Sequence, residues 1–450
     1  MHPNQLIDTT AELLRLVLRF EYPSDAELTR FFREHKSLGP RERGTLAEAV
    51  YCVVRLKPRF EYFCKISTNV KGNANRKLAL LGLSQATSLP LDTISAVERE
   101  WLMAAKNVDV ATLPAPLQHC LPLWLADALF AQYGADGVPL TMSLLEVAPL
   151  DLRVNAIKGK RDEVFSNLRS RGIELERSPF APNGLRLAGK PQLSKWPEFE
   201  KGVIEVQDEG SQLLAELLAP KRGEMVADFC AGAGGKTLAL GALMRNTGRL
   251  YAFDVSAKRL DKLAPRLARS GLSNVHPVAI DSERDSRIKR LAGKMDRVLV
   301  DAPCSGLGTL RRNPDLKWRQ SPESVVEMSA KQLAILQAAA TLVKPGGRLV
   351  YATCSLLHAE NGAVVEQFLA NATEFTLGGM QEFANSLGLS GQTDTLQLLP
   401  HREHTDGFFA ALFTRAAAQM PLPANEEVIV EAELDLDASL GAQGTTAASQ

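Results

Sequence analysis

The sequence predicts an α/β protein: a doubly wound sheet of mainly parallel strands, preceded by an all-helical domain and a small α+β module. Three observations predict this class. Between residues 225 and 352, five short apolar runs alternate with helical segments, which is the pattern of buried parallel strands. A glycine-rich loop follows the first run, and single acidic or cysteine residues follow the others. The length of 450 residues exceeds the usual size of one hydrophobic core, so we expect several domains.

The first part of the chain, to about residue 140, predicts a helical domain. Ser24 and Glu27, behind Pro23, have the spacing of a capping box that opens a helix. The stripe from Leu46 to Val54 has helical spacing, and its apolar residues are expected to pack in a helical core. Five basic residues lie in or near this stripe: Arg41, Arg43, Arg55, Lys57 and Arg59. This cluster of basic residues could contact RNA phosphate groups, or it could form a solvated helix face, and the sequence favours neither interpretation.

A small α+β module follows the helical domain. A short alternating run begins at Leu152, and a helical segment spans residues 161–171. Short strand patterns follow at 173–175 and 185–187. The C-terminal stretch is rich in alanine, glutamate and small polar residues, which is typical of disorder. The predicted division is a helical domain at 1–140, the small module at 141–205, the α/β domain at 206–415, and a disordered acidic tail at 416–450.

The charge of the chain is unevenly distributed. The formal net charge is zero, but no Lys or Arg follows Arg415, whereas six acidic residues do. Residues 1–415 therefore hold 52 basic and 46 acidic residues, a net of +6. This excess permits binding to nucleic acid without establishing it, because many basic residues only solvate helix faces.

The six cysteines show no CxxC spacing, so neither a zinc site nor a disulfide framework is predicted. The N-terminal residues lack the basic start and apolar run of a signal peptide, and no stretch is apolar enough to span a bilayer. We expect a monomeric cytoplasmic protein with reduced thiols, no bound metal and no membrane association.

The loop after the first predicted strand indicates a nucleotide-type ligand. Its residues are Cys230, Ala231, Gly232, Ala233, Gly234, Gly235 and Lys236. Glycines let the backbone approach a ligand, and the helix that follows offers free N–H groups. A dinucleotide site needs a third glycine where Thr237 stands, and a P-loop needs one at Cys230. A methyltransferase loop needs only a glycine turn, with acids after later strands to hold ribose and adenine.

Three aspartates stand where such acids are required. Asp254, Asp281 and Asp301 follow the second, third and fourth apolar runs, and Asp254 lies 22 residues after Gly232. One such aspartate alone would more often be a helix cap or a turn. Together with the glycine loop, they predict a site for S-adenosylmethionine.

Two cysteines mark the ends of neighbouring predicted strands. Cys304 follows the fourth apolar run in Asp301-Ala302-Pro303-Cys304, and Cys354 ends the fifth. A single cysteine there would most often be a small buried hydrophobe. In a doubly wound sheet, ligands bind outside the carboxyl ends of the strands, so both thiols are expected in one crevice beside the cofactor.

This pair of thiols suits methylation of cytosine at carbon 5. That carbon is a poor nucleophile until a thiolate adds to carbon 6, and a second thiol, or a water it positions, can then assist loss of the carbon-5 proton. Asp301 could act on ring nitrogen 3, and Lys236 or a helix N-terminus could lower the pKa of the attacking thiol. The residues themselves leave open which cysteine attacks.

These segments resemble the Nop/Sun group of RNA cytosine-5 methyltransferases. The resemblance covers about residues 145–415 and rests on the glycine loop, the three aspartates, both cysteine motifs, Gln207 to Gln212, and Thr405 to Phe409. It implies a Rossmann-like, class I methyltransferase in which the loop and the three aspartates bind S-adenosylmethionine. It further implies that Cys354 is the nucleophile and that Cys304 assists release. Ala233 stands where many members have proline, which leaves the turn plausible.

The flanking regions extend the resemblance. Residues 145–205 are similar to an RNA-binding, RRM-like extension, and the helical start, through Leu38 to Arg43, is similar to the NusB-like domain of bacterial RsmB-type enzymes. Those enzymes act on small-subunit ribosomal RNA, so 16S ribosomal RNA is the expected substrate. Two alternatives are a P-loop NTPase using Lys236 and Thr237, which leaves both cysteines unexplained, and a non-catalytic RNA-binding assembly factor, which needs neither thiol.

Overall fold

Five parallel strands form the part of the large sheet that carries the predicted site. The computed structural model describes residues 2–66, 73–87 and 90–417. The sheet has the order β10-β12-β9-β8-β5-β6-β7, with β11 paired to β12. Its parallel strands are β5 (Met225–Asp228), β6 (Arg249–Asp254), β7 (Val275–Ala279), β8 (Met295–Asp301) and β9 (Val343–Thr353). All five coincide with the five predicted strands to within a few residues.

Three antiparallel strands complete one edge of this sheet. They are β10 (Phe375–Leu377), β11 (Thr395–Leu398) and β12 (Phe408–Arg415). Strand β12 pairs with β9 from Thr353 opposite Phe409 to Arg348 opposite Thr414. The sheet is therefore mixed, and β9 lies inside it with both neighbours hydrogen-bonded.

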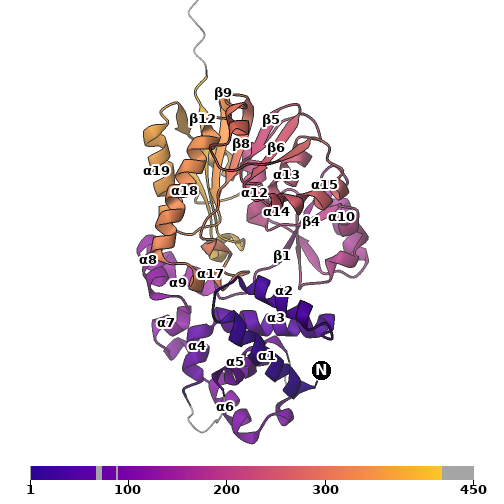
Figure 1. The fold of residues 1–450 in the computed structure, drawn as a ribbon, viewed down its shortest axis with the longest axis vertical. Coiled ribbons are helices and arrows are strands. Elements are labelled where there is room, and N and C mark those ends of the chain that lie inside the picture. The colour runs from indigo at the N-terminus through magenta and orange to yellow at the C-terminus, as the bar shows by residue number, and fades with distance from the viewer. Residues whose placement is uncertain (1, 67–72, 88–89, 418–450) are drawn as a thin grey trace, which may run out of the picture. The chain divides into compact units, whose positions relative to one another are not determined.

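Helices cover both faces of the sheet, which confirms the predicted α/β class (Figure 1). On one face lie α12 (Glu209–Leu218), α13 (Gly235–Leu243), α14 (Ala257–Asp261), α15 (Leu263–Ser270) and α20 (Met380–Leu387). On the other lie α16 (Ser286–Lys289), α18 (Pro322–Ala340) and α19 (Gly362–Asn371). Successive strand residues alternate between the two cores: Val350 and Ala352 pack in the first, Leu349 and Tyr351 in the second.

A smaller sheet precedes this domain. It contains β1 (Leu150–Val154), β2 (Leu175–Arg177), β3 (Gly184–Leu187) and β4 (Ile204–Val206) in the antiparallel order β2-β3-β1-β4. Helices α10 (Arg161–Ser170) and α11 (Pro197–Glu200) accompany it, and α10 contributes Val164, Phe165 and Leu168 to its core. The predicted helix at 161–171 is confirmed, and the strand predicted at 173–175 lies two residues later.

The N-terminal region is helical, as predicted. Its helices are α1 (Pro3–Val17), α2 (Ser24–Glu34), α3 (Pro40–Arg55), α4 (Lys57–Phe63), α5 (Ala74–Ala86), α6 (Ala96–Lys106), α7 (Ala115–His119), α8 (Leu123–Tyr133) and α9 (Gly137–Ser143). The stripe from Leu46 to Val54 lies on α3 and is buried in the helical core. The acidic tail predicted at 416–450 falls almost wholly outside the described residues. Within the part of the chain that is described, no helix is long and apolar enough to cross a membrane.

The capping box predicted at Ser24 is wrong. Helix α2 begins at Ser24 itself, with Pro23 as N-cap and no capping side chain. Ser24 is buried, and its N–H donates to Asp315 Oδ2 at 3.2 Å, 291 residues along the chain. A tertiary contact therefore satisfies the helix start in place of a local one.

The start of the chain contacts the α/β domain through a short helix, α17 (Leu316–Arg319). Lys317 Nζ donates to the carbonyl of Arg55 at 2.8 Å, and Trp318 Nε1 donates to the carbonyl of Val54 at 2.9 Å. Both acceptors lie at the end of α3, where carbonyl groups have no partner within the helix. The loop that follows Cys304 thus reaches the helical region.

Candidate active site

The glycine loop joins β5 to α13 in a conformation that requires glycine. Gly232 and Gly234 have φ angles of +56° and +82°, which lie in the left-handed region. A Cβ atom at Gly234 would also overlap the side chain of Leu263. The Gly232 N–H donates to Asp254 Oδ2 at 2.8 Å, which fixes the loop to the end of β6. Helix α13 then starts at Gly235 and directs its first N–H groups toward the loop.

Asp254 is a buried hydrogen-bond acceptor at the end of β6. Its side chain is 3% exposed, and its second oxygen, Oδ1, accepts from the N–H of Ser256 at 2.7 Å. Arg259 Nη1 lies 3.8 Å from Oδ2. Each carboxylate oxygen has two acceptor positions, so Asp254 can still accept hydrogen bonds from ribose hydroxyls.

Lys236 and Asp301 form a close ion pair between the loop and the end of β8. Lys236 Nζ donates to Asp301 Oδ2 at 2.6 Å. Burial opposes the ammonium form, but the charge and hydrogen bond of Asp301, with a further contribution from Cys354, raise the pKa of Lys236. The lysine is therefore held protonated, beside both Asp301 and the second predicted thiol.

The two predicted thiols meet at the ends of β8 and β9. The Sγ atoms of Cys304 and Cys354 are 3.3 Å apart, within hydrogen-bonding distance for sulfur. The hydrogen bond with Cys354, followed by burial and by the charges of Cys354 and Glu360, raises the pKa of Cys304 well above its ordinary value. Cys304 is therefore held in its protonated form.

A buried carboxylate that the sequence did not indicate ties the two cysteine loops together. Glu360 Oε1 accepts from the Ser305 N–H at 2.8 Å and from Gln332 Nε2 at 3.0 Å. Glu360 Oε2 accepts from the hydroxyls of Ser305, at 2.5 Å, and Ser355. Ser305 follows Cys304 and Ser355 follows Cys354, so one side chain positions both thiols. A lone glutamate five residues beyond Ser355 carries no pattern that would have identified it.

Two adjoining cavities bring most of the predicted residues together. The larger, 420 Å³, is lined by both cysteines, Asp254, Asp301 and Cys230, with apolar walls from Val255 and Ile280 among others. The smaller, 200 Å³, is lined by Cys230, Ala231, Gly232, Ala233, Gly235 and Lys236, and by four residues that were not predicted as cofactor ligands: Gln207, Ser211, Asp228 and Arg259. Cys230, Arg259 and Asp301 line both. Together they have the size of a ligand pocket that ends at the thiols.

Asp281 is the predicted residue that the structure places outside this site. Its carboxylate is 97% exposed, 3.6 Å from Arg287 Nη2, and it lines neither cavity. Glu283, two residues further on, lines the larger cavity instead. Gly234 also lines neither cavity; it faces Leu263, and its contribution to the site is the conformation of the loop.

The site fits S-adenosylmethionine. Asp228, at the end of β5, faces the smaller cavity; its Oδ2 accepts from the Thr237 hydroxyl at 2.7 Å, but Oδ1 is buried with no hydrogen-bond partner. Burial raises the pKa of Asp228 to about 7. The free acceptor suits the cofactor's ammonium group, Asp254 suits its ribose, and the exposed side chain of Val255 offers an apolar surface for adenine.

Comparison with known proteins agrees with this assignment. Residues 215–414 match the model of the 16S rRNA methyltransferase RsmB/F family, and residues 121–194 match the ferredoxin-like domain of RsmF/B-like methyltransferases. The probable ribosomal RNA small subunit methyltransferase B of Synechocystis sp. is 32% identical over 90% of this chain and 98% of its own length. The corresponding protein of Vibrio vulnificus is 30% identical over 85% and 93%.

Solved structures show the same architecture. The crystal structure of PH0851 has a TM-score of 0.73 and 28% identity, over 92% of this chain and 99% of that one. A methyltransferase homologue from Pyrococcus horikoshii has a TM-score of 0.59 and 30% identity, over 68% and 100%.

The fold and the site define a Rossmann-like methyltransferase that uses S-adenosylmethionine. The chain belongs to the ribosomal RNA small subunit methyltransferase B family.

Proposed function

We propose that this protein transfers a methyl group from S-adenosylmethionine to carbon 5 of a cytosine in 16S ribosomal RNA. The observation that carries the proposal is the 3.3 Å separation of the Cys304 and Cys354 thiols at the wall of the cofactor cavity. Methylation of an exocyclic nitrogen or a ribose hydroxyl would need no thiol. Two thiols beside the cofactor suit the covalent route to carbon 5.

Cys354 is the proposed nucleophile. Its thiolate forms a bond to carbon 6 of cytosine, and the electron pair displaced to carbon 5 then forms the new bond to the methyl group. S-adenosylmethionine supplies that methyl group from its sulfonium. Loss of the carbon-5 proton to a base then expels the Cys354 thiolate and restores the ring, so atoms and charges balance.

Cys304 is the proposed base for the last step, directly or through a water. While Cys354 is free, its hydrogen bond and charge raise the pKa of Cys304 and keep it protonated. Once Cys354 is bonded to carbon 6, it no longer carries that charge or accepts that hydrogen bond. Cys304 then ionises more readily, at the moment when a proton must be removed.

Lys236 and Asp301 are proposed to support the attacking thiol. The charge of Cys354 contributes to the raised pKa of Lys236, so a protonated ammonium group lies near the proposed nucleophile. Asp301 accepts a hydrogen bond from the Lys236 ammonium at 2.6 Å and holds it in place. Asp301 also lines both cavities, where it is proposed to contact the cofactor and the target cytosine. The glycine loop and Asp254 are proposed to bind the cofactor, with Asp228 and Glu283 in addition to the set predicted from the sequence.

The preceding regions are proposed to bind RNA. We assign residues 1–140 and 141–205 to substrate binding and 206–415 to catalysis. The monomeric state and the cytoplasmic location stay predictions. The P-loop alternative is disfavoured because Lys236 is engaged by Asp301, and the assembly-factor alternative gives no reason for paired thiols.

Methyl transfer by cysteine variants tests the proposal. We expect Cys354→Ala to abolish transfer of labelled methyl groups to 16S ribosomal RNA while binding S-adenosylhomocysteine with wild-type affinity in calorimetry. Cys64→Ala, outside both cavities, is the matched control. The wild-type product should contain 5-methylcytosine in bisulfite sequencing. Turnover near wild type in Cys354→Ala, or a product methylated elsewhere, would contradict the proposal.

A further inference from the structure

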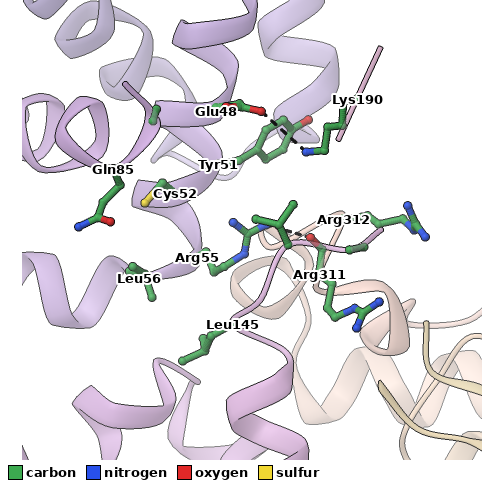
Figure 2. A pocket seen from close by; sticks show the side chains of 13 residues that line it. Glu48, Tyr51, Cys52, Arg55, Leu56, Gln85, Leu145, Lys190, Arg311 and Arg312 are labelled. Atoms are coloured by element: carbon green, nitrogen blue, oxygen red, sulfur yellow. Dashed lines mark hydrogen bonds and ion pairs between the residues drawn. The ribbon is translucent and has the colours of Figure 1, made fainter. Parts of the chain in front are cut away.

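The small α+β module contacts the rest of the chain in two contrasting ways. One contact lies at a third cavity, of 480 Å³, where Lys190 of the module faces Glu48 of α3 (Figure 2). Their charged atoms are 3.9 Å apart and each side chain is 56% exposed, so this ion pair contributes little to stability. The other contact is buried, and it joins β4 of the module to α15 of the α/β domain.

Glu205 carries the buried contact. It lies on β4, where Ile204 packs in the core of the module and Glu205 points from the opposite face. Its side chain is 4% exposed and receives two guanidinium groups from α15. Arg266 donates to Oε2 at 3.0 and 3.2 Å, and Arg269 donates to Oε1 at 2.7 and 3.1 Å. Each guanidinium uses two donors on one oxygen, so the carboxylate fixes the orientation of both side chains.

The end of α15 is held by the same module. Asn155, directly after β1, is buried and donates from Nδ2 to the carbonyl of Ser270 at 3.0 Å. Ser270 is the last residue of the helix, where carbonyl groups have no partner within the helix. The module therefore fixes both the charged side chains and the C-terminal end of α15.

The same helix holds the glycine loop. Arg266 Nη1 donates to the carbonyl of Ala233 at 2.7 Å, and Ala233 lines the smaller cavity. Leu263, at the start of the helix, occupies the space where Gly234 would carry a side chain. Glycine adopts many backbone conformations, so a loop rich in glycine needs contacts from outside to hold one of them. Arg266 supplies such a contact, while its other donors are held by Glu205.

We propose that Arg266 is a positioning residue for the cofactor loop, and that Glu205 of the small module holds it in place. The inference rests on the proposed cofactor site, and it adds a second role to a region assigned above to substrate binding. Through this relay, S-adenosylmethionine binds tightly only while the module is seated on α15. The module and the cofactor site therefore form one functional unit.

The test is calorimetric titration of S-adenosylhomocysteine into the full chain. Arg266→Met removes the guanidinium and keeps much of the side-chain volume, and Arg269 still pairs with Glu205, so the protein should fold. The loop then loses its anchor and populates other conformations. We expect the apparent affinity to fall about tenfold, which corresponds to a loop that is competent to bind about a tenth of the time. The KM for S-adenosylmethionine should rise with it, so that the loss falls on KM rather than on kcat.

Arg269→Met is the matched control. Arg269 lies three residues further along α15, pairs with the same carboxylate and covers the ring of Phe199, 4.6 Å from its centroid. Across the residues that the structure describes, it makes no hydrogen bond to the glycine loop. Its removal should cost a similar amount of stability in urea unfolding, yet leave the affinity for S-adenosylhomocysteine within about twofold of wild type. An equal loss of affinity in both variants would overturn the role of Arg266.

A double-mutant cycle tests the link to the module. Glu205→Gln should weaken S-adenosylhomocysteine binding on its own, because Arg266 loses its charged partner, and should have no further effect in Arg266→Met. A further loss in that background would overturn the relay. Lys190→Met, at the exposed contact with α3, should leave the affinity unchanged.

Two results separate this inference from the proposed function. A folded Arg266→Met protein with wild-type affinity would refute the relay and leave the cofactor site intact. A wild-type chain that does not bind S-adenosylhomocysteine would refute the cofactor site and the relay together.

Discussion

Substitution of Glu360 by glutamine should slow methyl transfer without weakening cofactor binding. Glu360 is fully buried and accepts hydrogen bonds from Ser305, Ser355 and Gln332, but it lines neither cofactor cavity. The glutamine oxygen can still accept from the Ser305 N–H and from Gln332 Nε2. The hydroxyls of Ser305 and Ser355 must then rotate to accept from the new amide NH₂ group. Two charge-assisted hydrogen bonds thereby become neutral ones, at a cost of about 1 kcal/mol each.

That cost falls on the loops that hold the thiols. About 2 kcal/mol of lost positioning corresponds to roughly a 30-fold decrease in the rate of the chemical step. The assay is single-turnover methyl transfer to 16S ribosomal RNA, together with calorimetric titration of S-adenosylhomocysteine. Glu366→Gln, on the same stretch of chain with 73% of its side chain exposed, is the control and should behave as wild type. A wild-type rate in folded Glu360→Gln, or an equal loss of cofactor affinity, would refute a positioning role.

Two further predictions concern stability. Gly234→Ala places a side chain at φ +82° against Leu263, so the free energy of unfolding should fall by about 2–3 kcal/mol, with loss of cofactor binding. Gly172→Ala, at φ +78° with open space around it, should lose only about 1 kcal/mol; equal losses in urea unfolding would contradict the packing argument. Burial lowers the pKa of Lys317 to about 7, so the folded state binds fewer protons than the unfolded state between pH 7 and 10. Wild-type stability should therefore rise across that range through this group, and Lys317→Met should flatten the rise; an unchanged pH profile would show that Lys317 is not held neutral.

The parallel strands and the site at their ends were predictable because their signals are local. Each strand is a short apolar run, and the glycine-rich loop, an aspartate or a cysteine stands at or just after its end. Parallel strands share one carboxyl edge, so these residues gather there. Cys304 and Cys354 are expected to lie close together because each follows a parallel strand that ends at this edge. The residues between the two cysteines carry no pattern that would predict the contact. Their 3.3 Å separation agrees with the expected shared crevice.

Other features depend on contacts that no local pattern reveals. The antiparallel edge formed by β10, β11 and β12 depends on strand order, which short apolar runs do not specify. Glu360 acts through partners up to 55 residues away, and Ser24 through Asp315. Asp281 has the right spacing for a cofactor ligand, but its side chain points into solvent toward Arg287. The backbone conformation of the turn after β7 determines where the Asp281 side chain points, and sequence spacing does not reveal that conformation.

The covalent intermediate provides the most direct test of the central claim. Cys304→Ala removes the proposed base for release and leaves Cys354, the proposed nucleophile, free to attack. Incubation with S-adenosylmethionine and 16S ribosomal RNA should therefore accumulate an RNA–protein adduct that survives a denaturing gel. Cys354→Ala and the double variant should form none. An adduct in Cys354→Ala would reverse the two roles, and no adduct in any variant, with methyl transfer intact, would contradict covalent catalysis.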